Sequence, residues 1–460
     1  MKAGISRARG SASRVSQRTA ESSMSFGPAN QLNQVKRWST SASHCRGIVA
    51  WTRGCPIAAL RLRTICTTLY LLTLLLVGCS TTERSPPEPA NLTDQSTVLG
   101  IPNARFYADT QAAAMAQEAL RAVERERAVN GPGAAVPVGR LPPANLLAIS
   151  GGSDDGAFGA GLLVGWTEAG TRPEFKLVSG VSTGALIAPF AFLGPAYDPQ
   201  LRAIYTGVQP EDIYEKRFIL TAVFNESFAD TAPLFRVISR HLNEEMMAAI
   251  AREYAKGRLL LIGTTNLDSQ RPVIWNIGAI AASGRPGAVD LVRKILLASA
   301  SVPGLFPPVL VDVEAGGQRF QEMHVDGGAV AQMFLYPPSV GLQANVKAIG
   351  RERHAFLIRN SRLDPDWASV ERNLFSITGR AISTMIHYSG YNDILRIYAT
   401  TQRDQVDYNL AFIGPDFNVE HKIPFDQAYM RALFDYGYQR GRAGFSWRKA
   451  PPILDTTSNK

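Results

Sequence analysis

The sequence FKLVSGVSTGALIAPFAFL at residues 175–193 reads as a strand, a sharp turn and a helix. Residues 175–179 have the composition of a buried strand, and residues 185–193 form an uncharged helical run. Between them lies Ser182, with Gly180 and Gly184 on either side. A strained strand-to-helix turn leaves no room for Cβ atoms beside an exposed hydroxyl. The stretch therefore predicts a nucleophilic serine, Ser182, held in an elbow formed by Gly180 and Gly184.

From residue 146 onward, apolar runs of strand length alternate with longer helical patterns. We expect strands at 146–150, 175–179, 259–266, 273–277, 355–359 and 408–413. We expect helices at 109–129, 157–169, 183–193, 233–255, 288–300, 366–398 and 425–442. A β-α-β alternation of this kind implies an α/β fold whose sheet is mostly parallel and covered by helices on both faces.

A second glycine-rich turn, GGSDDG at residues 151–156, follows the first expected strand. Backbone N–H groups in such a turn can converge on an anion. A phosphate-binding loop would continue with Gly-Lys-Ser/Thr, which does not follow here, and two aspartates would repel phosphate. We therefore expect an oxyanion hole, with candidate residues Gly151, Gly152, Ser153 and Gly156.

Further along the chain, a short apolar run ends in Asp326, which is followed by Gly327 and Gly328. Acyl transfer by a serine needs a base that accepts the hydroxyl proton. A carboxylate at the end of a strand can serve as this base, and an ordinary Asp-Gly turn is the alternative reading.

These three segments, in this order, resemble the patatin-like phospholipase family. The segment ASASVPGLFPPV at residues 298–309 is similar to a family segment that precedes the Asp-Gly pair, so the resemblance covers 146–328. It implies a three-layer α/β sandwich with a mostly parallel central sheet. It also implies a serine-dependent lipid acyl hydrolase with a Ser182–Asp326 dyad, in which Asp326 takes the serine proton directly.

The chain departs from the family in the oxyanion loop, where Ser153 and Asp155 replace a glycine and a basic residue. An acid about 5 Å from a developing oxyanion would oppose it by about 3 kcal/mol at an effective dielectric constant of 20. We therefore expect Asp154 and Asp155 to point away from Ser182. An inactive binding module that keeps the fold is the alternative function.

A Ser-His-Asp arrangement is the more common solution for serine hydrolases. His354 or His387 could join Ser182 and Asp326 in such a triad, and His324 could line the site. The resemblance predicts no catalytic histidine. We expect no metal and no cofactor, and no EF-hand-like loop suggests calcium dependence.

The net charge of +9 comes from the N-terminal leader. Residues 1–78 hold 11 basic residues and one acid, which leaves a net charge of −1 for 79–460. We therefore expect no nucleic-acid partner. All four cysteines, Cys45, Cys55, Cys66 and Cys79, lie in the first 79 residues, which excludes disulfides and thiolate metal sites in the body.

The leader ends in a lipoprotein-like signal. Arg61 and Arg63 precede an apolar run at 65–77, which would span only about 20 Å as a helix, against a hydrocarbon core of about 30 Å. Residues 76–79, LVGC, resemble the lipobox of bacterial lipoproteins, which implies that Cys79 is lipidated. An unlipidated signal peptide or a signal anchor is the alternative.

We expect four regions: a leader at 1–78 whose start is assigned too far upstream, a lipid-anchored tether and helix at 79–143, a catalytic core at 144–345, and the rest of the same α/β domain at 346–460. The tether is expected to be extended over 80–103, which is rich in Pro, Ser, Thr and Asn. Membrane lipids are then both substrate and anchor. Ser80 after the cysteine resembles outer-membrane lipoproteins, which places the protein in the bacterial cell envelope.

Overall fold

The computed structural model describes residues 84–130, 141–216, 229–341 and 351–454. All of them belong to one compact unit, Thr81–Lys460. The leader at 1–78 and the lipidation site Cys79 lie outside the described residues.

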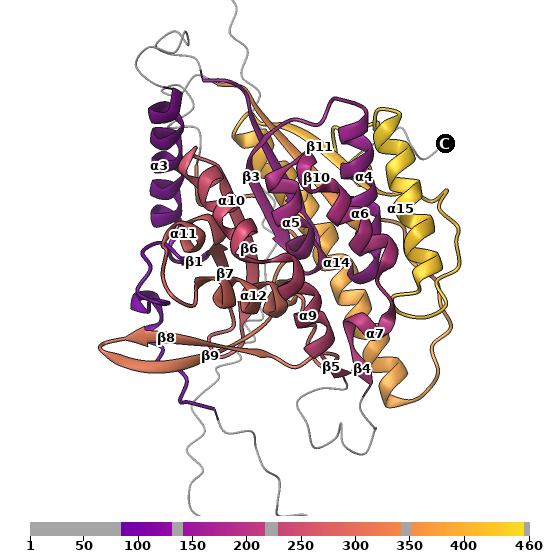
Figure 1. Cartoon of the computed structure of the whole chain (residues 1–460). Coiled ribbons are helices and arrows are strands. Elements are labelled where there is room, and N and C mark those ends of the chain that lie inside the picture. Colours follow the sequence, from indigo (N-terminus) through magenta and orange to yellow (C-terminus); the bar gives the residue numbers. More distant parts are fainter. Residues whose placement is uncertain (1–83, 131–140, 217–228, 342–350, 455–460) are drawn as a thin grey trace, which may run out of the picture. The chain divides into compact units, whose positions relative to one another are not determined.

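The centre of this unit is a parallel sheet (Figure 1). Its five parallel strands lie in the order β6, β3, β2, β10 and β11. Their bounds are Leu259–Asn266, Phe175–Val181, Ala144–Ile149, Arg353–Arg362 and Asp407–Ile413. The predicted mostly parallel α/β sheet is confirmed.

Antiparallel strands extend the sheet beyond β6. There β7 (Arg271–Asn276) pairs with β6, and β1 (Arg105–Tyr107) pairs with β7. A hairpin of β8 (Val309–Ala315) and β9 (Gln318–Asp326) joins the last residues of β6, where Asp326 pairs with Thr264. This pairing brings Asp326 to the edge at which the parallel strands end.

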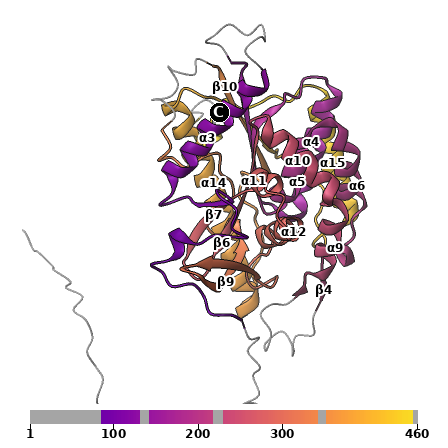
Figure 2. The ribbon, with the colours of Figure 1, turned by 60° about the vertical axis from the view of Figure 1, so that its left-hand side comes forward.

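Helices cover both faces of the sheet, as Figure 2 shows. Alternate residues of β2 belong to different cores: Leu147 and Ile149 lie in one cluster, and Leu146 and Ala148 in another. Because successive side chains of a strand point to opposite faces, the two clusters are the two faces of one sheet. The predicted three-layer arrangement is confirmed.

The helices divide between these two faces. The larger core includes residues of α4 (Gly156–Glu168), α5 (Thr183–Leu193), α6 (Asp198–Gly207), α9 (Ala232–His241), α10 (Glu244–Ala255), α12 (Ala288–Ser299) and α15 (Gln427–Arg442). The opposite face packs against α3 (Ala112–Asn130) and α14 (Leu374–Arg403). Shorter elements are α7 (Pro210–Ile213), α11 (Ile277–Ala282), β4 (Glu215–Lys216) and β5 (Ala229–Asp230).

Two expectations about local structure are wrong. The helix expected at 233–255 is two helices, because the Asn243 side chain accepts the Met246 N–H at 2.9 Å and caps a new helix, α10. The tether expected at 80–103 lies against the body from residue 84 onward. Val98 and Ile101 are buried, and Thr97 forms a β-bridge with Glu314, because these apolar groups find a place on the β8–β9 hairpin side of the sheet.

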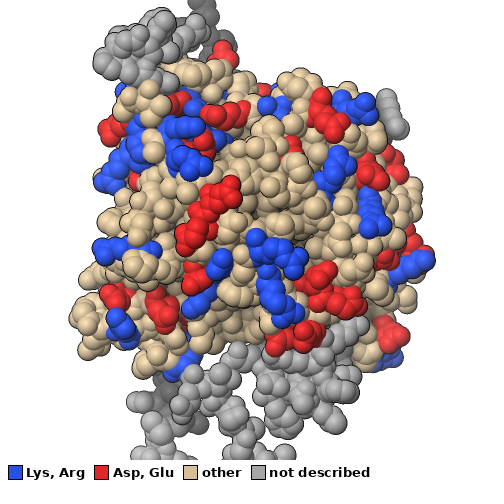
Figure 3. Space-filling model, in the orientation of Figure 1, with Lys and Arg blue, Asp and Glu red and all other residues tan. Residues whose placement is uncertain are grey.

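The surface seen in Figure 3 carries acidic and basic groups interspersed with uncharged ones. This distribution agrees with the near-zero net charge counted for 79–460. Among the helices that the structure describes, none combines the length and the apolar character needed to cross a membrane.

Candidate active site

Ser182 occupies a strained turn between β3 and α5. Its φ of 55° and ψ of −127° lie in a region that side-chain-bearing residues rarely adopt. A Cβ at Gly180 would lie 2.3 Å from the Gly184 carbonyl oxygen, and one at Gly184 would lie 2.2 Å from the Ile149 carbonyl oxygen. The predicted elbow therefore exists, and the glycines are required by close backbone approach.

The segment at 298–309 supports both candidate catalytic residues. Ser182 N–H donates to Ser299 Oγ at 3.0 Å, and Ser299 Oγ donates to the Gly263 carbonyl at 2.7 Å. Asp326 N–H donates to the Ser301 carbonyl at 2.8 Å. Sequence reasoning singled out this segment but assigned no role to Ser299, which holds the nucleophile's backbone in place.

Asp326 is buried beside Ser182. Its Oδ1 accepts the Gly328 N–H at 2.7 Å, while Oδ2 is buried and accepts no hydrogen bond from the residues described. Burial raises the pKa of Asp326 to about 7. Interactions with the Ser182 hydroxyl and the Gly328 amide act in the opposite direction and limit this rise. Ser182 and Asp326 thus interact without a hydrogen bond of normal geometry, which is common in catalytic pairs that have no substrate bound.

The glycine-rich turn lies next to the nucleophile. A Cβ at Gly151 would be 3.1 Å from Ser182 Cβ. Gly152 has a φ of 156°, and a Cβ there would lie 1.9 Å from the Asn360 carbonyl oxygen of β10. Only glycine fits at Gly152, because the turn is pressed against the neighbouring strand.

Two of the four predicted oxyanion residues cannot donate their N–H groups to a substrate. Gly151 N–H is bonded to the Gln332 carbonyl at 3.0 Å, and Gly156 N–H is bonded within the turn to the carbonyls of Ser153 and Asp154. Within the described parts of the chain, the N–H groups of Gly152 and Ser153 have no acceptor. The candidate oxyanion donors are therefore Gly152 and Ser153, and the prediction was wrong for Gly151 and Gly156 as donors because the turn uses their N–H groups itself.

The two aspartates of this turn, which we expected to point away from Ser182, bond with residues of the C-terminal segment. Asp154 Oδ2 bonds with His421 Nε2 at 2.7 Å and accepts the Phe425 N–H at 2.7 Å. Asp155 Oδ1 accepts the Tyr429 hydroxyl at 2.6 Å, and burial raises the pKa of Asp155 to about 7. The carboxylates thus fix the turn to α15 and the loop before it.

Arg359 supplies a positive charge near this turn. Its side chain is buried, and its Nε and Nη1 have no hydrogen-bond partner among the described residues. Burial lowers the pKa of Arg359 to about 10, an effect that the charges of Asp393 and Asp155 oppose. Arg359 of β10 therefore supplies a positive charge in place of the basic residue that the turn lacks. No local sequence signal marks Arg359 for this role.

We expect His421→Gln to destabilise the protein more at about pH 6 than at about pH 8.5. The bond to Asp154 raises the pKa of His421 above its ordinary value. A histidine whose pKa is higher in the folded than in the unfolded state stabilises the fold. This stabilisation is fully present below the pKa of the unfolded state and is lost as the pH rises through the pKa of the folded state. Thermal unfolding of both proteins at both pH values measures this, and a difference that does not shrink with rising pH would contradict it.

Gln332 connects the two catalytic turns. Its carbonyl accepts the Gly151 N–H at 3.0 Å, and its Nε2 donates to the Gly328 carbonyl at 3.0 Å. Its own N–H donates to Asp393 of α14 at 2.6 Å. Sequence reasoning missed Gln332, because two of its three partners, Gly151 and Asp393, lie far away in the chain.

The histidines of the alternative triad lie elsewhere. His354 pairs with Asn145 at the start of β2 and bonds with Asp407, so it lies at the opposite edge of the sheet from Ser182. His387 lies on α14, where its ring packs against that of Tyr388, and among the described residues it forms no hydrogen bond with Asp326. His324, expected to line the site, is fully buried between Thr264 Oγ1 and Glu322. The geometry therefore does not support the Ser-Asp-His alternative.

The chain was compared with known proteins. The family model described as patatin-like phospholipase matches residues 147–337. VipD from Legionella pneumophila is similar in structure, with 10% identity and a TM-score of 0.31 over 65% of this chain and 67% of that chain. Human GIVD cytosolic phospholipase A2 shows 10% identity and a TM-score of 0.27 over 62% of this chain and 51% of that chain. No curated protein sequence matches the chain.

The family match spans the strand that leads to the oxyanion turn, the serine elbow and the Asp-Gly turn. These are the segments that the structure brings together around Ser182. Residues 147–337 are therefore a patatin-like phospholipase domain.

Proposed function

We propose that the protein hydrolyses acyl esters of lipids with a Ser182–Asp326 dyad. A patatin-like phospholipase domain supports lipid acyl hydrolysis. The observation that carries the finer proposal is the strained Ser182 beside a buried carboxylate whose Oδ2 accepts no hydrogen bond from the described residues. A carboxylate in this setting is available to accept the proton of the neighbouring hydroxyl.

In the proposed reaction, Asp326 accepts the proton of Ser182 Oγ as the oxygen attacks the ester carbonyl carbon. The carbonyl oxygen becomes an oxyanion, which the N–H groups of Gly152 and Ser153 stabilise. The C–O bond to the alcohol breaks, and the alcohol leaves with the proton from Asp326. Water then attacks the acyl-serine, gives its proton to Asp326, and releases the fatty acid as Ser182 regains its hydrogen.

The positive end of the helix dipole of α5 also favours this chemistry. Ser182 directly precedes α5, an 11-residue helix with no charged residue. The N-terminus of a helix carries the equivalent of about half a positive charge, which stabilises negative charge developing at the nucleophile.

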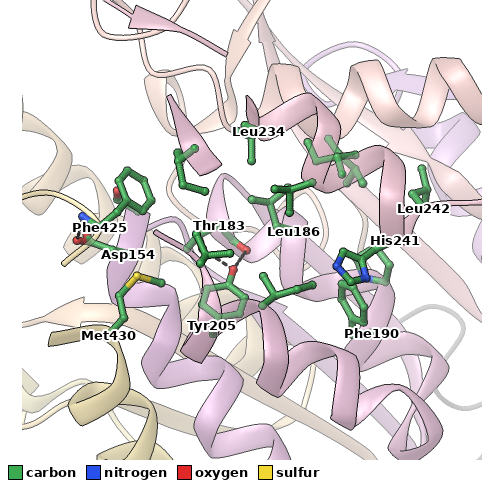
Figure 4. Close-up of a pocket in the computed structure, with 18 of the residues that line it drawn as sticks. Asp154, Thr183, Leu186, Phe190, Tyr205, Leu234, His241, Leu242, Phe425 and Met430 are labelled. Atoms are coloured by element: carbon green, nitrogen blue, oxygen red, sulfur yellow. Dashed lines mark hydrogen bonds between the residues drawn. The ribbon is translucent and has the colours of Figure 1, made fainter. Parts of the chain in front are cut away.

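An apolar cavity beside the site fits an acyl chain (Figure 4). The space in it that water-sized spheres can occupy is about 70 Å³, and the cavity lies mainly between α5, α6 and α9. Ser153 and Thr183 line it, so it begins next to an oxyanion donor and next to the nucleophile. Figure 4 shows Leu186 near the middle and His241 toward one end. A cavity with almost entirely apolar walls favours a hydrocarbon chain over a polar substrate.

We expect Val237→Phe to lower turnover of a sixteen-carbon acyl ester by about tenfold and to leave a four-carbon ester unchanged. Val237 lines the cavity and is half-buried, so a larger side chain fills the cavity with little disturbance of the core. Rates with p-nitrophenyl esters of increasing chain length measure this. Val237→Ala is the matched control and should not penalise the long chain. An equal loss for both chain lengths in Val237→Phe would place the acyl chain elsewhere.

We further propose that Cys79 anchors the protein to a membrane of the bacterial cell envelope, with the outer membrane as the expected location. The support is the lipobox-like sequence at 76–79. Two or more acyl chains give stable anchoring, because each buried methylene contributes about 0.8 kcal/mol. Mass spectrometry of the N-terminus tests this, and an intact Met1 would overturn it.

A further inference from the structure

The first half of α14 extends past the edge of the sheet that carries the active site. At its C-terminal half, Ile394 and Ile397 lie in the core, and Tyr398 packs on Tyr408 near the start of β11. Gly390 lies against Arg359, near the end of β10. Residues 374–389 therefore continue beyond the strand ends by about 24 Å, at about 1.5 Å per residue. Figure 1 shows α14 reaching the end of the molecule where β4 and α7 lie.

This overhanging half carries an apolar stripe, defined as Leu374, Ile377, Ala381, Met385 and Tyr388. At about 100° per residue, these five positions fall within about 80° of one another around the helix. Leu374 and Met385 are 74% and 71% exposed. Trp367, just before the helix, is 87% exposed. Contiguous exposed apolar side chains of this kind mark an interaction surface.

The apolar stripe does not belong to the protein core. Gly390, Ile394 and Ile397 define the side of α14 that packs against the body. The same 100° rotation places the stripe on the opposite side of the helix from them. The stripe therefore faces away from the sheet, and it covers nothing within the part of the chain that the structure describes.

The size and charge of the stripe favour a lipid surface as its partner. A stripe about 24 Å long and one side chain wide covers roughly 240 Å², well below the roughly 800 Å² per partner of a stable protein interface. No Asp or Glu occurs from Leu374 to Asn392, and the nearby Asp366 is paired with Arg380 of this half of the helix. Exposed Trp and Tyr side chains, here Trp367 and Tyr388, are favoured at the boundary between water and lipid.

We propose that the apolar stripe of α14 inserts into the surface of a phospholipid bilayer and so holds the protein at the lipid, at the end of the molecule toward which the Ser182 edge of the sheet points. The inference rests on the proposed function, because a lipid hydrolase must meet its substrate at such a surface. An interfacial helix buries its apolar face at the level of the headgroups without crossing the bilayer.

A fluorescent label at residue 385 tests the contact without any need for turnover. The four native cysteines all precede residue 80, so the full chain with each of them replaced by Ala accepts one label through Met385→Cys. With phosphatidylcholine vesicles, this label should shift its emission to the blue and be quenched by quencher-bearing lipids. A label at Leu120→Cys on α3, where the side chain is 39% exposed, should not respond. An unchanged label at 385 in the presence of vesicles overturns the proposal.

Rates of ester hydrolysis by the full chain, with its native cysteines, test the proposal independently of the label. The triple variant Leu374→Ser, Ile377→Ser and Met385→Ser should hydrolyse vesicle-borne esters at least about tenfold more slowly, with hydrolysis of a soluble four-carbon ester unchanged. The control triple variant Leu99→Ser, Leu120→Ser and Leu267→Ser changes three apolar residues elsewhere that are 39–40% exposed, and it should keep both activities. Parallel loss of both activities overturns the proposal. The proposal is also overturned if the parent protein is a dimer and the stripe variant is a monomer. A parent inactive on every ester refutes the proposed function alone, because the label experiment still reports docking.

Discussion

Ser182→Ala should reduce ester hydrolysis by about a thousandfold or more and abolish labelling by a fluorophosphonate probe. Removal of a serine nucleophile leaves only the residual effect of the oxyanion donors and of substrate binding. The fold should tolerate the change, because the alanine still occupies the strained turn with the same small Cβ. Rates with p-nitrophenyl esters and gel detection of the probe adduct measure the two effects.

Ser339→Ala is the matched control, since Ser339 is exposed and far from the elbow in the chain. It should keep full activity and full labelling. Activity that survives Ser182→Ala would refute the assigned nucleophile. A native chain that neither reacts with the probe nor cleaves esters would favour the binding-module alternative, in which the fold is kept without catalysis.

Asp326→Asn should also lower turnover by about a thousandfold, because an amide cannot accept the serine proton. In the native protein, the carboxylate must be ionised to act as the base, and burial raises the pKa of Asp326 to about 7. The kcat/KM of the native protein should therefore rise with pH up to about 7 and then level off. At about pH 5 it should be roughly a hundredfold lower than on the plateau, at tenfold per pH unit.

The same substitution should stabilise the protein at high pH. Because the folded pKa of Asp326 is raised above the unfolded value, the native carboxyl contributes stability below about pH 4 that is lost as the pH rises through about 7. The asparagine of Asp326→Asn does not ionise, so the variant does not lose this stability as the pH rises. The unfolding temperature of the variant should therefore exceed that of the native protein by more at pH 8 than at pH 4. A variant less stable than the native protein at pH 8 would show that the carboxylate is well solvated.

Two histidine variants separate the dyad from a triad. His354→Ala and His387→Ala should each keep turnover within a few-fold. His354 lies at the opposite edge of the sheet, and His387 packs against Tyr388 and forms no hydrogen bond with Asp326 among the described residues. A loss comparable to that of Asp326→Asn in either variant would restore the triad.

The sequence predicts most of the sheet and brings forward the candidate pair Ser182 and Asp326, because those signals are local. The strand-turn-helix at 175–193 appears with α5 at Thr183–Leu193, the range expected from composition. Ser182 and Asp326 are each marked by neighbouring glycines, which stand where the backbone comes close to other backbone atoms. The single helix expected at 233–255 fails because an internal Asn243 cap interrupts a continuous apolar pattern.

The remaining parts of the site depend on contacts between distant segments, which spacing cannot reveal. Arg359, Gln332 and His421 each reach the oxyanion turn or its neighbours from more than about 170 residues away in the chain. The occupied N–H groups of Gly151 and Gly156 likewise become visible only when their acceptors are known. Glycine content indicates where a turn lies, but not which of its N–H groups remain free.

The position of β10 has a consequence for the order in which this protein can fold. β10 lies between β2 and β11, and its Asn360 presses on Gly152, so a strand from the last quarter of the chain forms one wall of the oxyanion turn. Contacts this far apart in sequence close late, because the entropy of a long loop must be lost before the pairing repays it. A growing chain would therefore hold the residues of the serine elbow well before those of this wall, and the candidate oxyanion turn could take its final shape only when synthesis is nearly complete.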